Sequence, residues 1–176
     1  MSSSADLPHG WAVARLGNLG DWGSGGTPSK SNKAYYESGT IPWLVIGDLN
    51  ESVVYRSNLC ITEEGLKNSS AKLLPTGTLL VAMYGSIGKT AITGVQCATN
   101  QAIAYCQPHE GINLNYLHRI MQWLKPNLIV QGKGGTQQNI SQGILKNMWV
   151  FADQCGCNRA FSGSGGRKLA MTLSLR

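Results

Sequence analysis

The sequence contains few charged residues and no long hydrophobic run. Only 14% of its 176 residues are charged while 22 are glycine, a mixture that suits a turn-rich globule with β-strands more than a helical bundle. No apolar run approaches the roughly 20 residues that a membrane-spanning helix needs. The N-terminus also lacks the basic and then apolar pattern of a signal peptide. We therefore expect a cytoplasmic protein with no membrane segment.

The five cysteines and three histidines form neither a metal-ligand set nor a disulfide framework. Cys155 and Cys157 are separated by one residue instead of the two of a zinc knuckle, and no second pair exists. An odd number of cysteines without a secretion signal favours a reducing compartment. We expect no metal and no cofactor, and the single cysteines should be small buried residues.

Motifs for catalysis on DNA or nucleotides are also missing. Residues 85–90, GSIGKT, end like a phosphate-binding P-loop, but Met83 stands where that loop needs its first glycine. The sequence has no Asn-Pro-Pro-aromatic methyltransferase motif and no Pro-Asp start to a nuclease site. A β-turn with one exposed lysine is the better interpretation of residues 85–90. We therefore expect a protein that is not an enzyme.

A stretch from Leu73 to Ile103 organises the rest of the chain. Its apolar runs, 78–83 and 102–106, are bounded by glycines and indicate buried strands. The backbone must reverse after the first run, and side chains at such a reversal face solvent or a ligand. The exposed candidates at this turn are Tyr84, Ser86 and Lys89.

Shorter strands are predicted on both sides of this stretch. Residues 12–16 and 41–46 are short apolar runs, and Trp43 in the second should belong to the core. Asp48 follows in a turn, where a structural Asx-turn is a better interpretation than catalysis. A further short element should begin in residues 144–150.

Two helices are predicted from their capping residues. Thr62 should cap a short helix that has acidic residues in its first turn, and Asn113 should cap a longer one. The longer helix carries apolar residues at three- and four-residue steps, which indicate a core-facing stripe. Pro126 should kink or interrupt it.

Polar segments rich in glycine, serine, lysine and glutamine occupy residues 17–33, 67–72 and 131–143. Hydroxyl and ammonium groups can contact phosphate, whereas Gln and Asn side chains can pair with adenine edges. For residues 17–33 a solvated flexible loop is an equally open alternative.

The net charge supports an acidic partner only weakly. The chain carries a formal charge of +6, which would favour DNA. Half of that excess lies after residue 150, so the body of the chain carries only +3.

Nine short motifs, in order along the chain, resemble a known family. They are Leu7-Pro-x-Gly-Trp11, Gly25-Gly-Thr-Pro28, Gly39-Thr-Ile-Pro-Trp43, Gly47-Asp-Leu49, Ile61-Thr-x-x-Gly-Leu66, Leu74-Pro-x-Gly-Thr78, Gly85-x-Ile-Gly88, Thr99-Asn-Gln-Ala102 and Gly134-Gly-Thr-Gln137. Together they resemble a target recognition domain of the DNA specificity (S) subunit of type I restriction–modification enzymes.

The resemblance implies an α+β fold, with a twisted β-rich body, a few short helices and a truncated C-terminal helical arm. It implies a non-catalytic module that reads one half of a bipartite site in double-stranded DNA. The implied protein partners are a methyltransferase (modification) subunit and, through it, an endonuclease (restriction) subunit. The alternative is a remnant or interaction scaffold that folds without assembling an active complex.

The resemblance covers residues 7–150 and stops there. We expect residues 1–6 to be disordered and residues 7–150 to form the recognition domain. Residues 151–176 form an atypical basic tail without helical periodicity. A frameshifted or truncated gene product is the favoured explanation, and an unusual native tail is the alternative.

The polar loops supply the candidate DNA contacts, and we expect these loops to gather on one side of the body. Phosphate contacts would set the register in the major groove, and a few polar side chains would read base edges. The candidates are Lys30, Lys33, Tyr36, Ser69, Lys72, Tyr84, Ser86, Lys89, Lys133, Gln137, Gln138 and Asn139.

Overall fold

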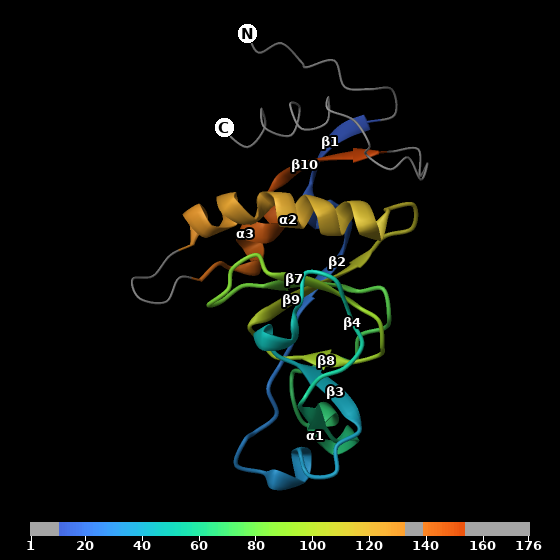
Figure 1. Ribbon diagram of the computed structural model, residues 1–176, viewed down its shortest axis with the longest axis vertical. Helices are drawn as coiled ribbons and strands as arrows, with labels where there is room; N and C mark the ends of the chain where they lie inside the picture. Colours follow the sequence, from blue (N-terminus) through green and yellow to red (C-terminus); the bar gives the residue numbers. More distant parts are fainter. Residues whose placement is uncertain (1–10, 133–138, 154–176) are drawn as a thin grey trace.

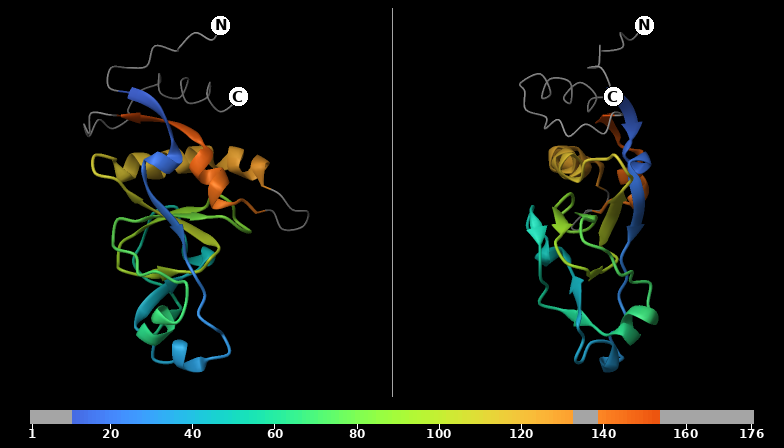
Figure 2. Two further views of the ribbon diagram at one scale, coloured as in Figure 1. Left: turned by 180° about the vertical axis from the view of Figure 1, so that it is seen from behind. Right: turned by 90° about the vertical axis from the view of Figure 1, so that its right-hand side faces the viewer.

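A computed structural model describes residues 11–132 and 139–153 of the chain. The described part is elongated, with a two-stranded sheet and a long helix at one end (Figure 1). A five-stranded sheet lies in the middle, and a small three-stranded sheet with a short helix forms the other end (Figures 1 and 2).

The five-stranded sheet carries the central stretch of the sequence. Its strand order is β2 (Gly20–Ser24), β9 (Ile103–Pro108), β6 (Leu79–Ala82), β7 (Thr90–Thr93) and β4 (Val53–Val54). All neighbours are antiparallel except β4 and β7, which pair in parallel. Both apolar runs predicted as buried strands are confirmed as β6 and β9, and they pair with each other.

The lower end is built from short elements around Trp43. Strand β3 (Ile41–Leu44) lies between β5 (Cys60–Ile61) and β8 (Ala98–Thr99). Helix α1 (Glu63–Lys67) and the 3-10 turn η2 (Lys33–Tyr35) lie beside them. The predicted strand and the core position of Trp43 are confirmed, because this side chain is only 4% exposed.

The upper end joins the beginning of the described chain to its end. Strand β1 (Trp11–Arg15) pairs antiparallel with β10 (Trp149–Asp153), and η1 (Leu16–Asn18) follows β1. Helix α3 (Gln142–Asn147) precedes β10, and the long helix α2 (Leu114–Gln131) packs across β6 and β7. Strand β10 crosses residue 150, which is the last residue covered by the family resemblance. Residues 1–6 and 154–176 lie outside the described part.

Helix α2 confirms the predicted apolar stripe. Leu117, Met121, Leu124 and Leu128 are at most 1% exposed and pack in the largest core cluster. The predicted N-cap is also confirmed, since the Asn113 side chain accepts a hydrogen bond from the amide of Tyr116 at 3.1 Å.

The predicted interruption at Pro126 is wrong, because α2 continues through this residue to Gln131. Proline cannot donate to the carbonyl four residues earlier. Pro126 lies on the exposed side of the helix, where water can satisfy the carbonyl that has lost its donor. Burial of the leucine stripe on the opposite side stabilises the helix enough to carry it past the proline.

The prediction of one loop over residues 17–33 is wrong in its first half, where β2 pairs with β9. A side chain at Gly20 would collide with the Gln107 carbonyl and the Cys106 sulfur. This glycine therefore allows close strand packing, where the sequence suggested flexibility. The indole of Trp22 fixes the strand further by donating to the Leu16 carbonyl at 3.1 Å.

The cap predicted for the short helix is confirmed, since the Thr62 hydroxyl accepts from the amide of Gly65 at 3.1 Å and so caps α1. At Asp48 the predicted structural role holds, but the predicted Asx-turn does not. The Asp48 carboxylate accepts from the amide of Val45, three residues earlier, at 2.9 Å and closes η3 (Ile46–Asp48).

Cys97 and Cys106 are buried thiols, whereas Cys60 is half-buried. Burial raises the pKa of Cys97 to about 12 and, with the nearby charge of Asp21, that of Cys106 to about 12. Both thiols therefore stay protonated at neutral pH and act as small apolar side chains. Cys155 and Cys157 lie outside the described residues.

Candidate nucleic-acid interface

The turn between β6 and β7 projects from the sheet just below α2 (Figure 1). The amide of Gly88 donates to the Ala82 carbonyl at 2.9 Å, and the amide of Ala82 donates to the Lys89 carbonyl at 2.8 Å. Gly85 and Gly88 have positive φ angles of 63° and 74°, so they make the reversal that the sequence predicts.

Asn139 lies directly beside this turn. It forms an antiparallel β-bridge with Tyr84, and the amide of Ile140 donates to the Met83 carbonyl at 2.9 Å. Ile140 is only 2% exposed, so it anchors the segment in the core. The candidates Tyr84 and Asn139 are thus brought together, with their side chains exposed.

Ser86 is exposed at the tip of the turn, as predicted. Lys89 closes the turn and is half-buried, whereas the sequence predicts an exposed lysine. The Lys89 ammonium donates to the carbonyl of Ile46 at 3.3 Å and so links the turn to η3. An ammonium has three donors, which leaves capacity for a phosphate. We define Tyr84, Ser86, Lys89 and Asn139 as the turn group.

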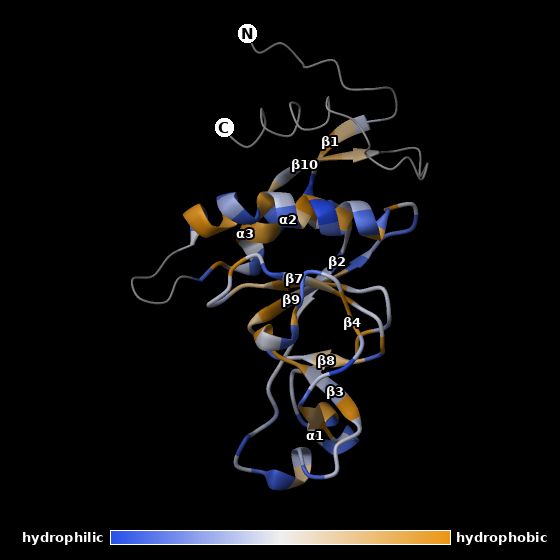
Figure 3. Ribbon diagram, viewed as in Figure 1, coloured by the Kyte–Doolittle hydropathy of each residue, from blue (hydrophilic) through white to orange (hydrophobic). Residues whose placement is uncertain are grey.

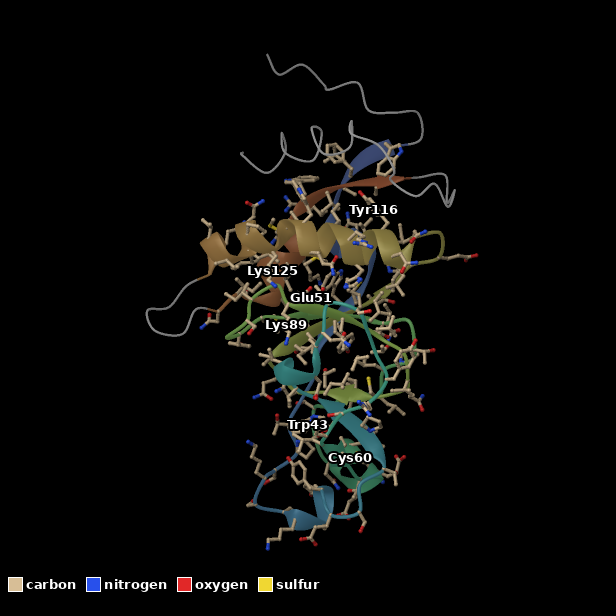
Figure 4. The ribbon with its side chains drawn as sticks, viewed as in Figure 1. Trp43, Glu51, Cys60, Lys89, Tyr116 and Lys125 are labelled. Carbon is tan, nitrogen blue, oxygen red and sulfur yellow. The ribbon has the colours of Figure 1, made fainter. Side chains whose placement is uncertain are left out.

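A polar network lies between this turn and α2. Glu51 pairs with Lys125 at 2.8 Å and accepts from the Thr90 hydroxyl at 2.8 Å. The hydroxyl oxygen of Thr90 in turn lies 3.0 Å from Nε2 of His118. Figure 4 shows Glu51 between Lys125 on α2 and Lys89.

The network sets the charge of its members. Burial alone would raise the pKa of Glu51, but hydrogen bonds from Lys125 and Thr90, with the charge of Lys125, bring it below its usual value. Burial lowers the pKa of His118, an effect that the charge of Glu51 opposes and that of Arg119 reinforces. At neutral pH the carboxylate is therefore ionised and the imidazole is neutral.

The remaining described candidates form a second group at the lower end of the molecule, where residues 28–33 have hydrophilic colours in Figure 3. Gly26 packs against Ser70 and Ala71, because a side chain at this glycine would collide with both residues. We define Lys30, Lys33, Tyr36, Ser69 and Lys72 as the lower group.

Two members of the lower group make structural contacts. The Tyr36 hydroxyl donates to the Pro28 carbonyl at 2.6 Å, and its ring packs edge-on against Trp43. Burial raises the pKa of Tyr36. The Ser69 hydroxyl accepts from the amide of Ala71 at 3.2 Å. The three lysines of the group are exposed.

The two groups lie at different levels of the long axis, so the candidates do not form one cluster (Figure 1). Lys133, Gln137 and Gln138 lie outside the described residues. The structure therefore brings Tyr84, Ser86, Lys89 and Asn139 together, and it places the lower group apart from them.

The described ranges, 11–132 and 139–153, contain no cluster of three or more His, Cys, Asp or Glu residues that could hold a metal ion. None of the helices within them has the length and apolar character required to cross a bilayer.

Residues 8–150 match the type I restriction modification DNA specificity domain. The chain belongs to this family.

Curated relatives of the specificity domain are considerably longer proteins. The chain is 34% identical over 110 residues to the EcoR124I/EcoR124II specificity subunit of Escherichia coli, covering 60% of the chain and 27% of that subunit. It is 33% identical over 119 residues to the MjaIX specificity subunit of Methanocaldococcus jannaschii, covering 66% of the chain and 27% of that subunit. The chain thus spans about a quarter of the length of these relatives.

Solved structures confirm the α+β fold of the specificity domain. The HsdS subunit from Thermoanaerobacter tengcongensis superposes with a TM-score of 0.64 at 19% identity, covering 97% of this chain and 38% of that one. A chain from a study of type I R-M complex assembly and conformational transition gives a TM-score of 0.67 at 22% identity, covering 97% and 39%.

Sequence reasoning missed Glu51 and Lys125 of the specificity domain. They are 74 positions apart, and only packing of α2 on the sheet brings them together. The local sequence indicates only a turn at Asn50, next to Glu51.

Proposed function

We propose that this specificity domain reads one half of a bipartite site in double-stranded DNA and is not itself catalytic. It would direct a methyltransferase subunit and, through it, an endonuclease subunit, in the cytoplasm. The domain would comprise residues 7–153, since β10 continues past residue 150 to pair with β1. Family membership supports this role, and no observation favours a scaffold that folds without assembling.

The turn group carries the proposal. Exposed aromatic, hydroxyl and amide side chains project from two adjoining backbone segments that are held rigidly by hydrogen bonds. Amide side chains can pair with adenine edges, and lysine and serine can contact phosphate oxygens. The turn group therefore combines positioning contacts with base-reading contacts.

Two substitutions separate these roles in a duplex-binding assay with the 176-residue chain at low salt. Lys89→Met keeps most of the aliphatic stem but removes the charge, so it should weaken binding to all sequences equally. Asn139→Ala should change the preferred sequence, at a cost of about 1–3 kcal/mol for the base that it contacts.

The matched control is Asn115→Ala, which removes an exposed amide near the start of α2. It should change neither affinity nor preference. If Asn139→Ala selects the same sequences from a randomised duplex pool as the unmodified chain, the assignment of base reading to the turn group is wrong.

A further inference from the structure

Lys125 lies against the β6–β7 turn although it comes from α2. A side chain at Gly88 would come within 2.9 Å of the Lys125 Cγ atom, so the lysine stem packs directly on the turn backbone. The Lys125 side chain remains 37% exposed. Its position beside the turn group is therefore fixed by packing, while more than a third of the side chain remains exposed.

Glu51 holds that ammonium in place. Its carboxylate accepts from Lys125 and from Thr90, each at 2.8 Å. Its backbone amide donates to the Thr90 carbonyl at 2.9 Å, and its carbonyl accepts from the Gln122 side chain at 3.0 Å. These contacts come from both β7 and α2, so Glu51 is fixed between the sheet and the helix.

The chemistry of the pair suits a shared phosphate contact. Lysine has three N–H donors, and among residues 11–132 and 139–153 the Lys125 ammonium donates to Glu51 alone. An unpaired carboxylate beside DNA would repel phosphate, whereas here it is neutralised by the lysine that it orients. Lys89, across Glu51 from Lys125 in Figure 4, adds a second ammonium beside the single carboxylate.

We propose that Lys125 contacts a DNA phosphate next to the turn group and that Glu51 is its positioning residue. This inference rests on the proposed function and adds two residues to it. In the bound state the ammonium would bridge the carboxylate and the phosphate. Glu51 would then limit sequence-independent affinity while it fixes where the phosphate lies.

The test measures duplex affinity of the full chain over a series of salt concentrations. Replacing a phosphate-contacting lysine should reduce the slope of log affinity against log salt by about 0.9. We expect this reduction for Lys125→Gln and retention of the slope for Lys125→Arg. A melting temperature for each variant checks that all of them are folded.

Arg119→Gln is the matched control, because it removes one exposed charge from the same helix. Arg119 lies about 9 Å nearer to the N-terminus of α2 at the usual rise per residue. Its replacement should leave the slope unchanged. Equal effects of Lys125→Gln and Arg119→Gln would overturn the inference and leave the proposed function standing.

Glu51→Gln distinguishes a positioning role from a merely structural one. Its single amide oxygen can still accept from Lys125, while the NH2 group replaces the oxygen that accepted from Thr90, and the negative charge is gone. Binding to all sequences should tighten by roughly two- to fivefold, as the modest strength of a half-exposed ion pair implies. Weaker binding by a fully folded Glu51→Gln chain would overturn the inference, and absence of binding by the unmodified chain at low salt would overturn the proposed function too.

Discussion

Replacing Trp43 with alanine is expected to destabilise the domain by about 3–5 kcal/mol, the range found for buried large aromatic residues. The side chain is 4% exposed and packs with Ile41 and Ile61 in the core cluster of the lower end. Its indole also donates to the Gly26 carbonyl at 3.0 Å. Because typical domains are stable by only about 5–15 kcal/mol, this loss is a large fraction of the total. Urea denaturation measures it.

Trp43→Phe separates packing from hydrogen bonding at the same position. Phenylalanine keeps most of the buried ring but leaves the Gly26 carbonyl without its indole donor, which should cost about 1–3 kcal/mol. The alanine variant should therefore be clearly less stable than the phenylalanine variant. Equal stability of the unmodified chain, the alanine variant and the phenylalanine variant would contradict the placement of Trp43 in the core.

Gly25→Ala is the second substitution with a large expected effect, about 3 kcal/mol of destabilisation, at the upper end for overpacking. An added Cβ would collide with the backbone oxygen and the hydroxyl of Thr99. The adjacent amide of Gly26 donates to the same Thr99 carbonyl at 2.8 Å, so the two segments cannot separate without losing that bond.

Gly47→Ala provides the control for this prediction. Gly47 is exposed, and an added Cβ would have no atom within 4 Å. Thermal or urea unfolding should therefore show almost no change for Gly47→Ala and a large loss for Gly25→Ala. If both substitutions were tolerated equally, the close approach of residues 25–26 to Thr99 would be wrong.

The parts of the fold that sequence predicts well are those specified by local pattern. Helix α2 follows from its leucine spacing and the cap at Asn113, and α1 follows from the cap at Thr62. Strand β6 follows from an apolar run that is buried on both faces, and β9 follows from an apolar run that is buried at Ile103, Ala104 and Cys106. Each of these signals lies within a few residues of the element that it defines.

Strands β2 and β7 were not predicted, for different reasons. The segment 20–24, GDWGS, has the composition of a loop, and pairing with β9 makes it extended. For β2 the partner strand therefore overrides local propensity. The segment 90–93, TAIT, carries three β-branched residues that favour a strand, and it pairs with β6.

The candidate site was predictable to a similar degree. The turn after β6 could be located from its glycines, so the exposed positions of Tyr84 and Ser86 at that turn were predicted. Tyr36 was chosen on chemical grounds alone, and the structure gives its hydroxyl an acceptor at Pro28. Residue type cannot distinguish a hydroxyl that bonds the protein from one that awaits a ligand. Lys125 was missed because its position depends on how α2 crosses the sheet.

The most direct measurement of the central claim is the methylation pattern of an assembled enzyme. Residues 7–153 would be joined to an intact spacer and second recognition domain from a type I specificity subunit, and methylated bases would be mapped across a genome. The account predicts a bipartite motif in which Asn139→Ala alters one half only. A motif that does not change with this domain, or an Asn139→Ala enzyme with an unaltered motif, would contradict it.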